Sequence, residues 1–293
     1  MDMQKPEWLK TKYDNKSVEK INQLLRQLSI HTVCKEADCP NIGECSKKNT
    51  ATFMIMGNIC TRNCRFCAVQ KGIGSPLDLA EPDNIAIAAQ KLNLKHIVIT
   101  SVTRDDLEDG GAMHFSKTIR SLKKVLPEST IEVLIPDLGG KKQNLEIIMA
   151  AQPDVINHNM ETVPSLYPQV RPEADYRRSL NILKYIKEKE PYMITKTGIM
   201  MGLGESKKEV IKVIDDLAQI GCDILTIGQY LCPSVNHIPV QRYLSPRIFA
   251  QYKKMAVQKG IKYVASDPLV RSSYNALEAI RAIKGRGRYD LCR

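Results

Sequence analysis

The sequence predicts an α/β fold in which strands and helices alternate, arranged as a partial (βα)6 TIM-like barrel. Short β-rich runs alternate with segments of helical apolar spacing from about position 51 onward. This alternation favours parallel strands joined by right-handed crossovers. Six such units fall short of the roughly eight units and 250 residues of a closed barrel. A doubly wound sheet is the alternative that fits the same alternation.

The individual elements follow from residue type and spacing. Three helices are expected between the strands: one that starts near Pro82, one that stops at Gly221 and one that ends at Gly260. Proline suits the first turn of a helix, and glycine suits its end. The strands are expected at Thr52–Met56, His96–Thr100, Ile131–Ile135, Val155–His158, Met193–Met200 and Ile224–Ile227, with a further short strand at Ile261–Ala265.

We expect one α/β domain with an appendage at each end. The barrel is predicted over residues 51–265, and an extension that carries a cysteine motif is predicted over residues 1–50. A C-terminal tail that folds back is predicted over residues 266–293. No internal repeat or low-complexity linker divides the sequence further.

Composition restricts the class of protein. The 293 residues are 43% hydrophobic, which is enough for a large core and excludes a mainly disordered chain. No apolar run approaches the roughly 18 residues that cross a bilayer, and the first residues lack the apolar core of a secretion signal. A cytoplasmic protein without membrane contact is therefore expected. The excess of 43 Lys and Arg over 32 Asp and Glu permits an anionic partner but identifies no site.

The sharpest motif is Cys60-x3-Cys64-x2-Cys67, directly after the first expected strand. Loops at the carboxyl ends of parallel strands form the active face of such folds. Three thiolates at this spacing can hold three irons of a [4Fe–4S] cluster and leave the fourth iron open. An open iron can bind a cosubstrate through an amine and a carboxylate. A zinc site is the alternative, although zinc favours C-x2-C pairs and closed shells of four ligands.

A second group of three cysteines lies upstream, at Cys34, Cys39 and Cys45. Its C-x4-C-x5-C spacing predicts an auxiliary cluster or a structural zinc site, since thiolates are soft ligands that suit both. The remaining cysteines lack paired spacing, and Cys222 and Cys232 are expected to be packing residues. The scattered histidines, His158 among them, are expected to be structural.

These motifs resemble those of radical S-adenosylmethionine (SAM) enzymes and, among them, the lipoyl synthase family. The resemblance extends from about Cys34 to Tyr274 and ends in the distinctive Arg-Ser-Ser-Tyr. The segments that carry it are Ala51–Gly57, Cys60–Cys67, Pro76–Asp78, Glu81–Pro82, Thr100–Leu107, Asp109–Ala112, His158–Pro164, Gly202–Glu205, Ile227–Tyr230 and Arg271–Tyr274.

The resemblance implies roles for particular residues. Cys60, Cys64 and Cys67 would hold the SAM-binding [4Fe–4S] cluster. A serine of Arg-Ser-Ser-Tyr would be the fourth ligand of the auxiliary [4Fe–4S] cluster at Cys34, Cys39 and Cys45. We favour Ser273, and Ser272 is the alternative that the sequence leaves open. Contacts to SAM would come from Gly110, Gly111, Asn159 and Glu161, and more weakly from Arg104, Arg171 and the Gly202–Glu205 loop.

The resemblance also implies a reaction and its partners. Two sulfurs of the auxiliary cluster would enter C6 and C8 of an octanoyl chain on a carrier lysine, with two SAM molecules consumed. These carbons are unactivated, so a radical cofactor has to carry out the difficult step. The expected partners are lipoyl domains of 2-oxoacid dehydrogenase E2 subunits, the glycine cleavage H-protein, flavodoxin or ferredoxin as electron donor, and an iron–sulfur carrier protein.

Other classes of protein share some of these features. Biotin synthase and a tRNA methylthiotransferase share the radical chemistry, but the upstream cysteine triplet and Arg-Ser-Ser-Tyr argue against both. A zinc-stabilised nucleic-acid binder would account for the charge of +11. Aromatic residues are only 5% of the chain, too few for the stacking surface of a single-strand binder, so no nucleic-acid partner is expected.

Overall fold

The structure is a computed structural model. It describes residues 4–9, 23, 25–28, 30–36, 52–273 and 276–290, and of these only the backbone at 34, 35 and 285–290. Within these ranges, no helix has the length and apolar character needed to span a membrane.

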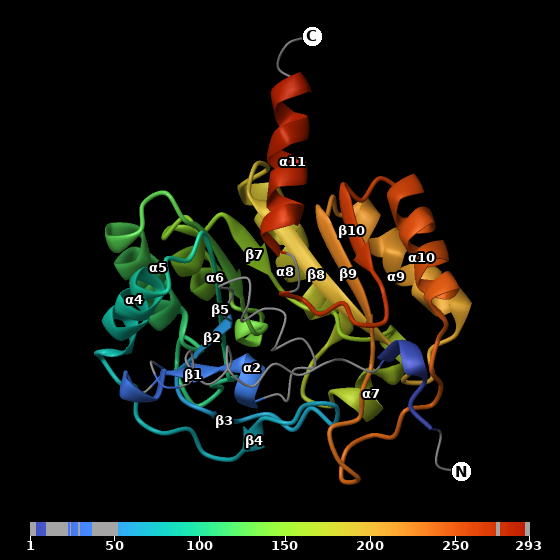
Figure 1. Ribbon diagram of the computed structural model, residues 1–293, viewed down its shortest axis with the longest axis horizontal. Helices are drawn as coiled ribbons and strands as arrows, with labels where there is room; N and C mark the ends of the chain where they lie inside the picture. Colours follow the sequence, from blue (N-terminus) through green and yellow to red (C-terminus); the bar gives the residue numbers. More distant parts are fainter. Residues whose placement is uncertain are drawn as a thin grey trace.

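An eight-stranded sheet forms the centre of the molecule (Figure 1). All neighbouring strands are parallel except the first pair, which is antiparallel. The order across the sheet is β1 (His31–Thr32), β2 (Thr52–Ile55), β5 (His96–Ser101), β6 (Thr130–Leu134), β7 (Val155–Asn157), β8 (Ile194–Met201), β9 (Ile224–Gln229) and β10 (Tyr263–Ser266).

The strand order decides between the two predicted architectures. A doubly wound sheet reverses its order at a switch point, whereas the strands here follow chain order from β2 to β10 without reversal. The prediction of a partial barrel is therefore confirmed. The six main strands lie where β-rich runs predicted them, with ends that differ by one or two residues. The antiparallel β1 was not predicted.

Helices flank the sheet. Figure 1 shows α4 and α5 on one side of the strands and α9 and α10 on the other. The three predicted helices are confirmed as α4, α9 and α10, and α9 begins with a capping box between Ser206 and Glu209, an arrangement that satisfies two free amides. The long helices are α4 (Glu81–Lys91), α5 (Ala112–Val125), α6 (Lys142–Met149), α8 (Tyr176–Lys189), α9 (Lys207–Gln219), α10 (Pro246–Gln258) and α11 (Ala276–Asp290).

Short elements lie mostly in the loops at the carboxyl ends of the strands. The pair β3 and β4 brackets the cysteine loop. These elements are η1 (Glu7–Leu9), α2 (Val33–Glu36), β3 (Ile59–Cys60), β4 (Gln70–Lys71), η2 (Leu138–Gly140), η3 (Pro164–Leu166) and α7 (Tyr167–Val170).

The two ends of the barrel differ in character. At the amino ends of β7, β8 and β9, Val155, Ile194 and Ile224 form a buried cluster with Ala279 and Ile280 of α11. This helix stands away from the loops that carry β3 and β4 (Figure 1). One end of the barrel is thus packed with apolar side chains, and the opposite end is left for chemistry.

Candidate metal-cluster site

Cys60, Cys64 and Cys67 line one cavity of about 320 Å³. Residues of β2, β5, β6, β8 and β9 line the same cavity, which places it across the carboxyl ends of the barrel strands. The three cysteines of the predicted cluster loop are therefore brought together. A second cavity, of about 310 Å³, lies between α6 and α8 and holds basic side chains but no cysteine.

Backbone contacts shape the cysteine loop. Cys60 ends β3, which pairs with β4 in parallel, and the Cys67 amide donates to the Cys64 carbonyl at 3.2 Å. The amide of Thr103, just after β5, donates to Cys60 Sγ at 3.3 Å. This contact ties the sulfur of Cys60 to the end of β5. In the described ranges, no group of three His, Cys, Asp or Glu side chains is close enough together to hold a single metal ion.

The thiols are held in a poorly solvated place. Burial raises the pKa of Cys64 to about 12, although the Arg171 charge opposes the rise. Burial likewise raises the pKa of Cys67 to about 11. Both are therefore protonated at neutral pH without metal, and metal binding has to remove their protons. Three soft sulfur donors on one cavity are the donor set that an iron–sulfur cluster needs.

Asn159 and Glu161 line the cavity from the loop after β7. Asn159 Nδ2 donates to Glu161 Oε1 at 3.0 Å, while Asn159 Oδ1 finds no partner in the described part of the chain. Burial raises the pKa of Glu161, with Arg171 and Asn159 opposing. Glu161 also has a φ of 63°, a strained conformation for a residue with a side chain and one that occurs often at functional sites.

Arg171 reaches the same cavity from the segment after α7. It is 8% exposed, and its Nη1 donates to the carbonyls of Asn159 at 2.8 Å and Met160 at 3.3 Å. Its Nε donor has no partner among the residues described. The guanidinium lies 5.2 Å from the Tyr167 ring centroid. The two carbonyls thus fix the guanidinium of Arg171, and its Nε is available to donate to a ligand in the cavity.

His158 was expected to be structural, yet it lines the cavity. Its Nδ1 lies 2.9 Å from the carbonyl of Ile135, so Nδ1 carries the proton and Nε2 is an acceptor. Nε2 is buried without a partner in the described structure. Burial, assisted by Arg171, lowers the pKa of His158 to about 4. Its position directly after a strand and before Asn159 was the available signal.

Gly110 and Gly111 are not among the residues that line the cavity. Gly111 is the N-cap of α5 with a φ of 88°, and a Cβ there would lie 2.2 Å from Met56 Sδ. Gly110 faces Leu138. Gly111 is therefore needed for close packing, Gly110 is favoured by its φ of 60°, and the contact of both with SAM stays a prediction.

Arg104 and Glu205, two of the weaker predicted contacts to SAM, are also not among the residues that line the cavity. Arg104 is 2% exposed and pairs with Asp106 at 2.8 Å. Glu205 is buried and accepts from the amides of its own loop, those of Gly202 at 2.8 Å and Leu203 at 2.9 Å among them. Arg104 is therefore paired within its own loop, and Glu205 is held by its own loop and by Arg242 at 3.6 Å.

The upstream cysteines lie largely outside the described residues. Cys39 and Cys45 are outside them, and Cys34 is described by its backbone alone, within α2. Val33, the residue before Cys34, lines the cysteine cavity. From the C-terminal side Ser272 lines it as well, whereas Ser273 does not. The start of one predicted cysteine motif and one candidate serine therefore lie beside the other motif.

Known proteins share both the sequence and the fold. The family model of the radical SAM superfamily matches residues 54–217. The lipoyl synthase of Caldanaerobacter subterraneus subsp. tengcongensis is 55% identical over 285 residues, 97% of this chain and 100% of the relative. That of Alkaliphilus metalliredigens is 52% identical over 277 residues, 94% of this chain and 96% of the relative.

Solved structures agree on the fold. Methylornithine synthase has a TM-score of 0.54 at 13% identity, covering 93% of this chain and 95% of that one. Streptococcus suis SuiB bound to SAM has a TM-score of 0.56 at 11% identity, covering 77% of this chain and 53% of that one. At such identities the likeness concerns the fold alone. By its near full-length identity to the curated relatives, the chain belongs to the lipoyl synthase family within the radical SAM superfamily.

Proposed function

We propose that the chain inserts two sulfur atoms, at C6 and C8, into an octanoyl group carried on a lysine of a protein, as its family does. It is a radical SAM enzyme by family. The observation that carries the proposal is the cavity on which three thiols converge with several polar atoms that have no partner among the residues described. Buried polar atoms without partners are rare in native proteins unless a ligand or water completes them.

Cys60, Cys64 and Cys67 are the proposed ligands of the SAM-binding [4Fe–4S] cluster. When bound, such a cluster supplies the electron that cleaves SAM and so starts radical chemistry. The protein side of this task is to hold the three thiols around one cavity. The Thr103 amide donates to Cys60 Sγ and so helps to fix the position of that sulfur.

Four side chains around the cysteines are proposed to bind SAM. Glu161, a half-buried residue on the cavity wall, is an acceptor for the cosubstrate's amino group, and Arg171 Nε is a donor for its carboxylate. His158 Nε2 and Asn159 Oδ1 accept from amino or hydroxyl groups. Gly110 and Gly111 remain predicted contacts without support from the cavity lining.

An auxiliary [4Fe–4S] cluster on Cys34, Cys39 and Cys45 is the proposed sulfur source. Its support is the position of Val33 and Ser272 on the wall of the cysteine cavity. A sulfur donor has to lie within reach of the carbon radical, so a shared cavity suits it. Ser273 stays the predicted fourth ligand, and Ser272 is the alternative that the cavity lining favours.

The proposal includes partners, a location and an organisation. The carriers are E2 lipoyl domains and the glycine cleavage H-protein, flavodoxin or ferredoxin donates electrons, and an iron–sulfur carrier rebuilds the auxiliary cluster. A cytoplasmic location suits the free thiols at Cys60, Cys64 and Cys67, since thiols are kept reduced there. Residues 1–50, 51–265 and 266–293 are the proposed extension, barrel and tail.

Mass spectrometry of an octanoylated lipoyl-domain peptide tests the proposal. Incubation with anaerobically reconstituted protein, SAM and reductant is expected to add two sulfurs to the peptide. Cys64→Ala is expected to abolish both sulfur insertion and the formation of 5′-deoxyadenosine. Cys39→Ala is expected to lose insertion while SAM cleavage stays measurable. Cys232→Ala, a half-buried thiol outside the cavity, is the matched control and keeps both.

Two results would contradict the proposal. One is a wild-type protein that forms 5′-deoxyadenosine but leaves the octanoyl peptide unchanged while another substrate gains sulfur. The other is a colourless reconstituted protein that binds zinc and no iron, because a protein with two clusters is brown and absorbs broadly near about 400 nm.

A further inference from the structure

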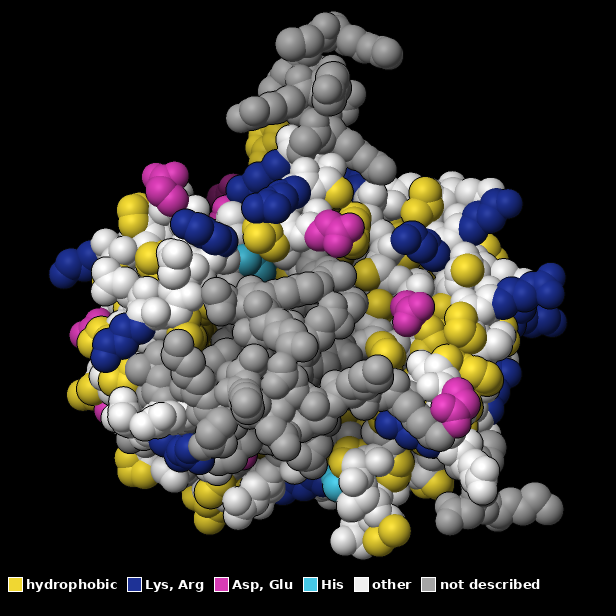
Figure 2. All heavy atoms as spheres, viewed as in Figure 1, with side chains coloured by type: hydrophobic (Ala, Val, Ile, Leu, Met, Phe, Trp, Pro, Cys, Tyr) yellow, Lys and Arg dark blue, Asp and Glu magenta, His cyan; other side chains and the backbone are white. Residues whose placement is uncertain are grey.

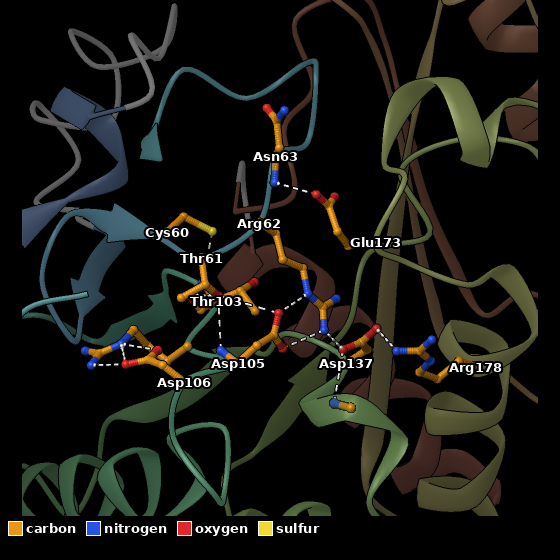
Figure 3. A network of polar contacts seen from close by, with 12 residues as sticks. Cys60, Thr61, Arg62, Asn63, Thr103, Asp105, Asp106, Asp137, Glu173 and Arg178 are labelled. Carbon is orange, nitrogen blue, oxygen red and sulfur yellow. Dashed lines mark hydrogen bonds and ion pairs between the residues drawn. The ribbon is translucent and has the colours of Figure 1, made fainter. Parts of the chain in front are cut away.

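The three residues between Cys60 and Cys64 all contact loops on the barrel rim (Figure 3). Thr61 Oγ1 donates to the Thr103 carbonyl at 3.0 Å, after β5. The amide of Asn63 donates to Glu173 Oε1 at 3.3 Å, beyond α7. Arg62, between them, reaches the loops after β5 and β6. The spacer of the C-x3-C motif is therefore a docking segment as well as a connection.

Arg62 makes the strongest of these contacts. Its side chain is 6% exposed. Nε and Nη2 donate to the two carboxylate oxygens of Asp105 at 2.6 and 2.8 Å, and Nη2 also donates to Asp137 Oδ1 at 2.6 Å. A fork on one carboxylate fixes the plane of the guanidinium, and the second carboxylate fixes its depth. A lysine could not reproduce this geometry.

Asp137, the second partner of Arg62, is a buried carboxylate with several donors around it. Its side chain is fully buried, and the Gly139 amide donates to Oδ1 at 3.2 Å. Arg178 Nη1 approaches Oδ2 at 3.3 Å from the other side. Burial opposes ionisation of Asp137, but Arg62 outweighs it and lowers its pKa. The carboxylate therefore remains charged, and it would be an unpaired buried charge without its arginines.

The partners of Arg62 adjoin residues that line the cavity. Asp105 lies two residues beyond Thr103, whose amide points at Cys60 Sγ, and the Asp105 amide donates back to Thr61 Oγ1 at 3.1 Å. Asp137 directly follows Pro136, which lines the cavity. Through these neighbours Arg62 fixes the cysteine loop relative to the ends of both strands.

We propose that Arg62 is a positioning residue that holds the Cys60–Cys64 segment on the rims of β5 and β6, so that the thiols stand ready before iron arrives. A segment already tied to the barrel rim through Thr61, Arg62 and Asn63 loses less conformational freedom when it binds iron than a free loop would. The inference rests on the proposed function for one point, the assignment of the three cysteines as cluster ligands.

The test compares three variants in a Cys39→Ala background, so that only the cluster at Cys60, Cys64 and Cys67 is followed. Asp105→Asn weakens the fork, and its side chain is 44% exposed, so it leaves no buried charge behind. Arg62→Lys keeps the charge but loses the fork. Arg178→Gln removes the other cation of Asp137 without touching the cysteine loop, and it is the matched control.

Full-length proteins are reconstituted anaerobically and challenged with an iron chelator. Iron loss is followed by absorption near 400 nm. Asp105→Asn and Arg62→Lys are expected to lose iron about 10- to 100-fold faster than the parent, the usual effect of removing a partner that orients a metal ligand. Arg178→Gln is expected to match the parent. Electron paramagnetic resonance of the reduced cluster is expected to show a smaller SAM-induced change in the two affected variants.

Melting of the iron-free proteins by circular dichroism separates positioning from general destabilisation. Iron loss in Asp105→Asn as slow as in the parent overturns the inference. Faster loss that tracks a lowered melting midpoint and appears equally in Arg178→Gln also overturns it. If Arg62→Lys does not fold, Asp105→Asn alone decides. A parent that holds no cluster at all contradicts the proposed function instead.

Discussion

Four side chains that line the cysteine cavity each bury one polar atom that has no partner in the described part of the chain: Ser101 Oγ, His158 Nε2, Asn159 Oδ1 and Arg171 Nε. His158 and Asn159 offer acceptors, Arg171 offers a donor, and the Ser101 hydroxyl can be either. An unsatisfied buried group costs about 1–3 kcal/mol, and four beside one cavity indicate that a polar ligand completes them. The amino, carboxylate and hydroxyl groups of SAM offer the complementary set.

His158→Phe tests this at the residue that sequence reasoning missed. Phenylalanine fills a similar volume but lacks the Nε2 acceptor. Loss of one hydrogen bond costs about 1 kcal/mol, so the dissociation constant for SAM is expected to rise roughly fivefold. Calorimetric titration of the reconstituted protein measures it. His158→Gln, which retains an acceptor, is expected to recover part of the affinity, and unchanged affinity in His158→Phe would refute the contact.

The pKa of His158 predicts that the affinity for SAM does not change between pH 6 and pH 8 on account of this residue. Its folded-state pKa, lowered by burial to about 4, lies below the ordinary value of 6.5, so His158 stays neutral from pH 8 to pH 6. Its acceptor is therefore present throughout this range. SAM affinity is expected to show no loss with a midpoint near 6.5. A wild-type loss of that kind, absent from His158→Gln, would mean that the imidazole is protonated and donates instead.

At the scale of elements, the barrel separates stability from chemistry. The cysteine loop and the polar residues lie at the carboxyl ends of the strands, and α11 packs Ala279 and Ile280 against the opposite ends. A tail that folds back was predicted over residues 266–293, but neither the helix α11 nor its place at the amino ends of the strands was. Ile280 and its partners Val155 and Ile224 are far apart in the sequence, so no local pattern indicates their contact.

Ile280→Ala is expected to reduce stability without disturbing the site. Ile280 is 2% exposed, and removing a buried isoleucine side chain costs about 2–5 kcal/mol. Urea unfolding of the iron-free protein, followed by circular dichroism, measures the loss. Glu278→Ala, an exposed change on the same helix, is expected to stay within about 0.5 kcal/mol of wild type. SAM cleavage per bound iron is expected to be unchanged, and its parallel loss would show that the two ends are coupled.

At the scale of the whole molecule, prediction succeeded where the information is local in sequence. The strand–helix alternation and the Cys60-x3-Cys64-x2-Cys67 spacing gave the barrel and the place of its cavity. Gly110 and Gly111 were less tractable, since a glycine pair fits a packing contact with Met56 as well as a ligand contact. The sequence gives a net charge of +11 but not its distribution. Figure 2 shows Lys and Arg side chains at several separate places on the face in view.

Contacts between distant residues could not be foreseen. Lys196 of β8 and Glu132 of β6 are 64 residues apart, yet Lys196 Nζ lies 2.9 and 3.0 Å from the two Glu132 oxygens. Asn157 Nδ2 of β7, between them, donates to Glu132 Oε1 at 3.1 Å. Both charged side chains are 1% exposed. A charged layer thus joins three strands inside the barrel, between the apolar end and the cysteine cavity.

This layer predicts how stability depends on pH. Burial would raise the pKa of Glu132, but Lys196 and His96 outweigh it and lower the pKa from 4.5 to about 2. Because the folded value lies below the unfolded one, the stabilisation is complete above about pH 4.5 and is lost as the pH falls toward 2. The lowering corresponds to about 3 kcal/mol.

Glu132→Gln isolates this contribution from that of other carboxyl groups. Urea unfolding of both iron-free proteins between pH 7 and pH 3.5 gives the difference in free energy of unfolding. The wild type is expected to be the more stable near pH 7, where the variant leaves Lys196 buried without its carboxylate, and the difference is expected to shrink below about pH 4.5. A constant difference down to pH 3.5 would mean that Glu132 gains no stabilisation from its charge, and that the layer stands on packing alone.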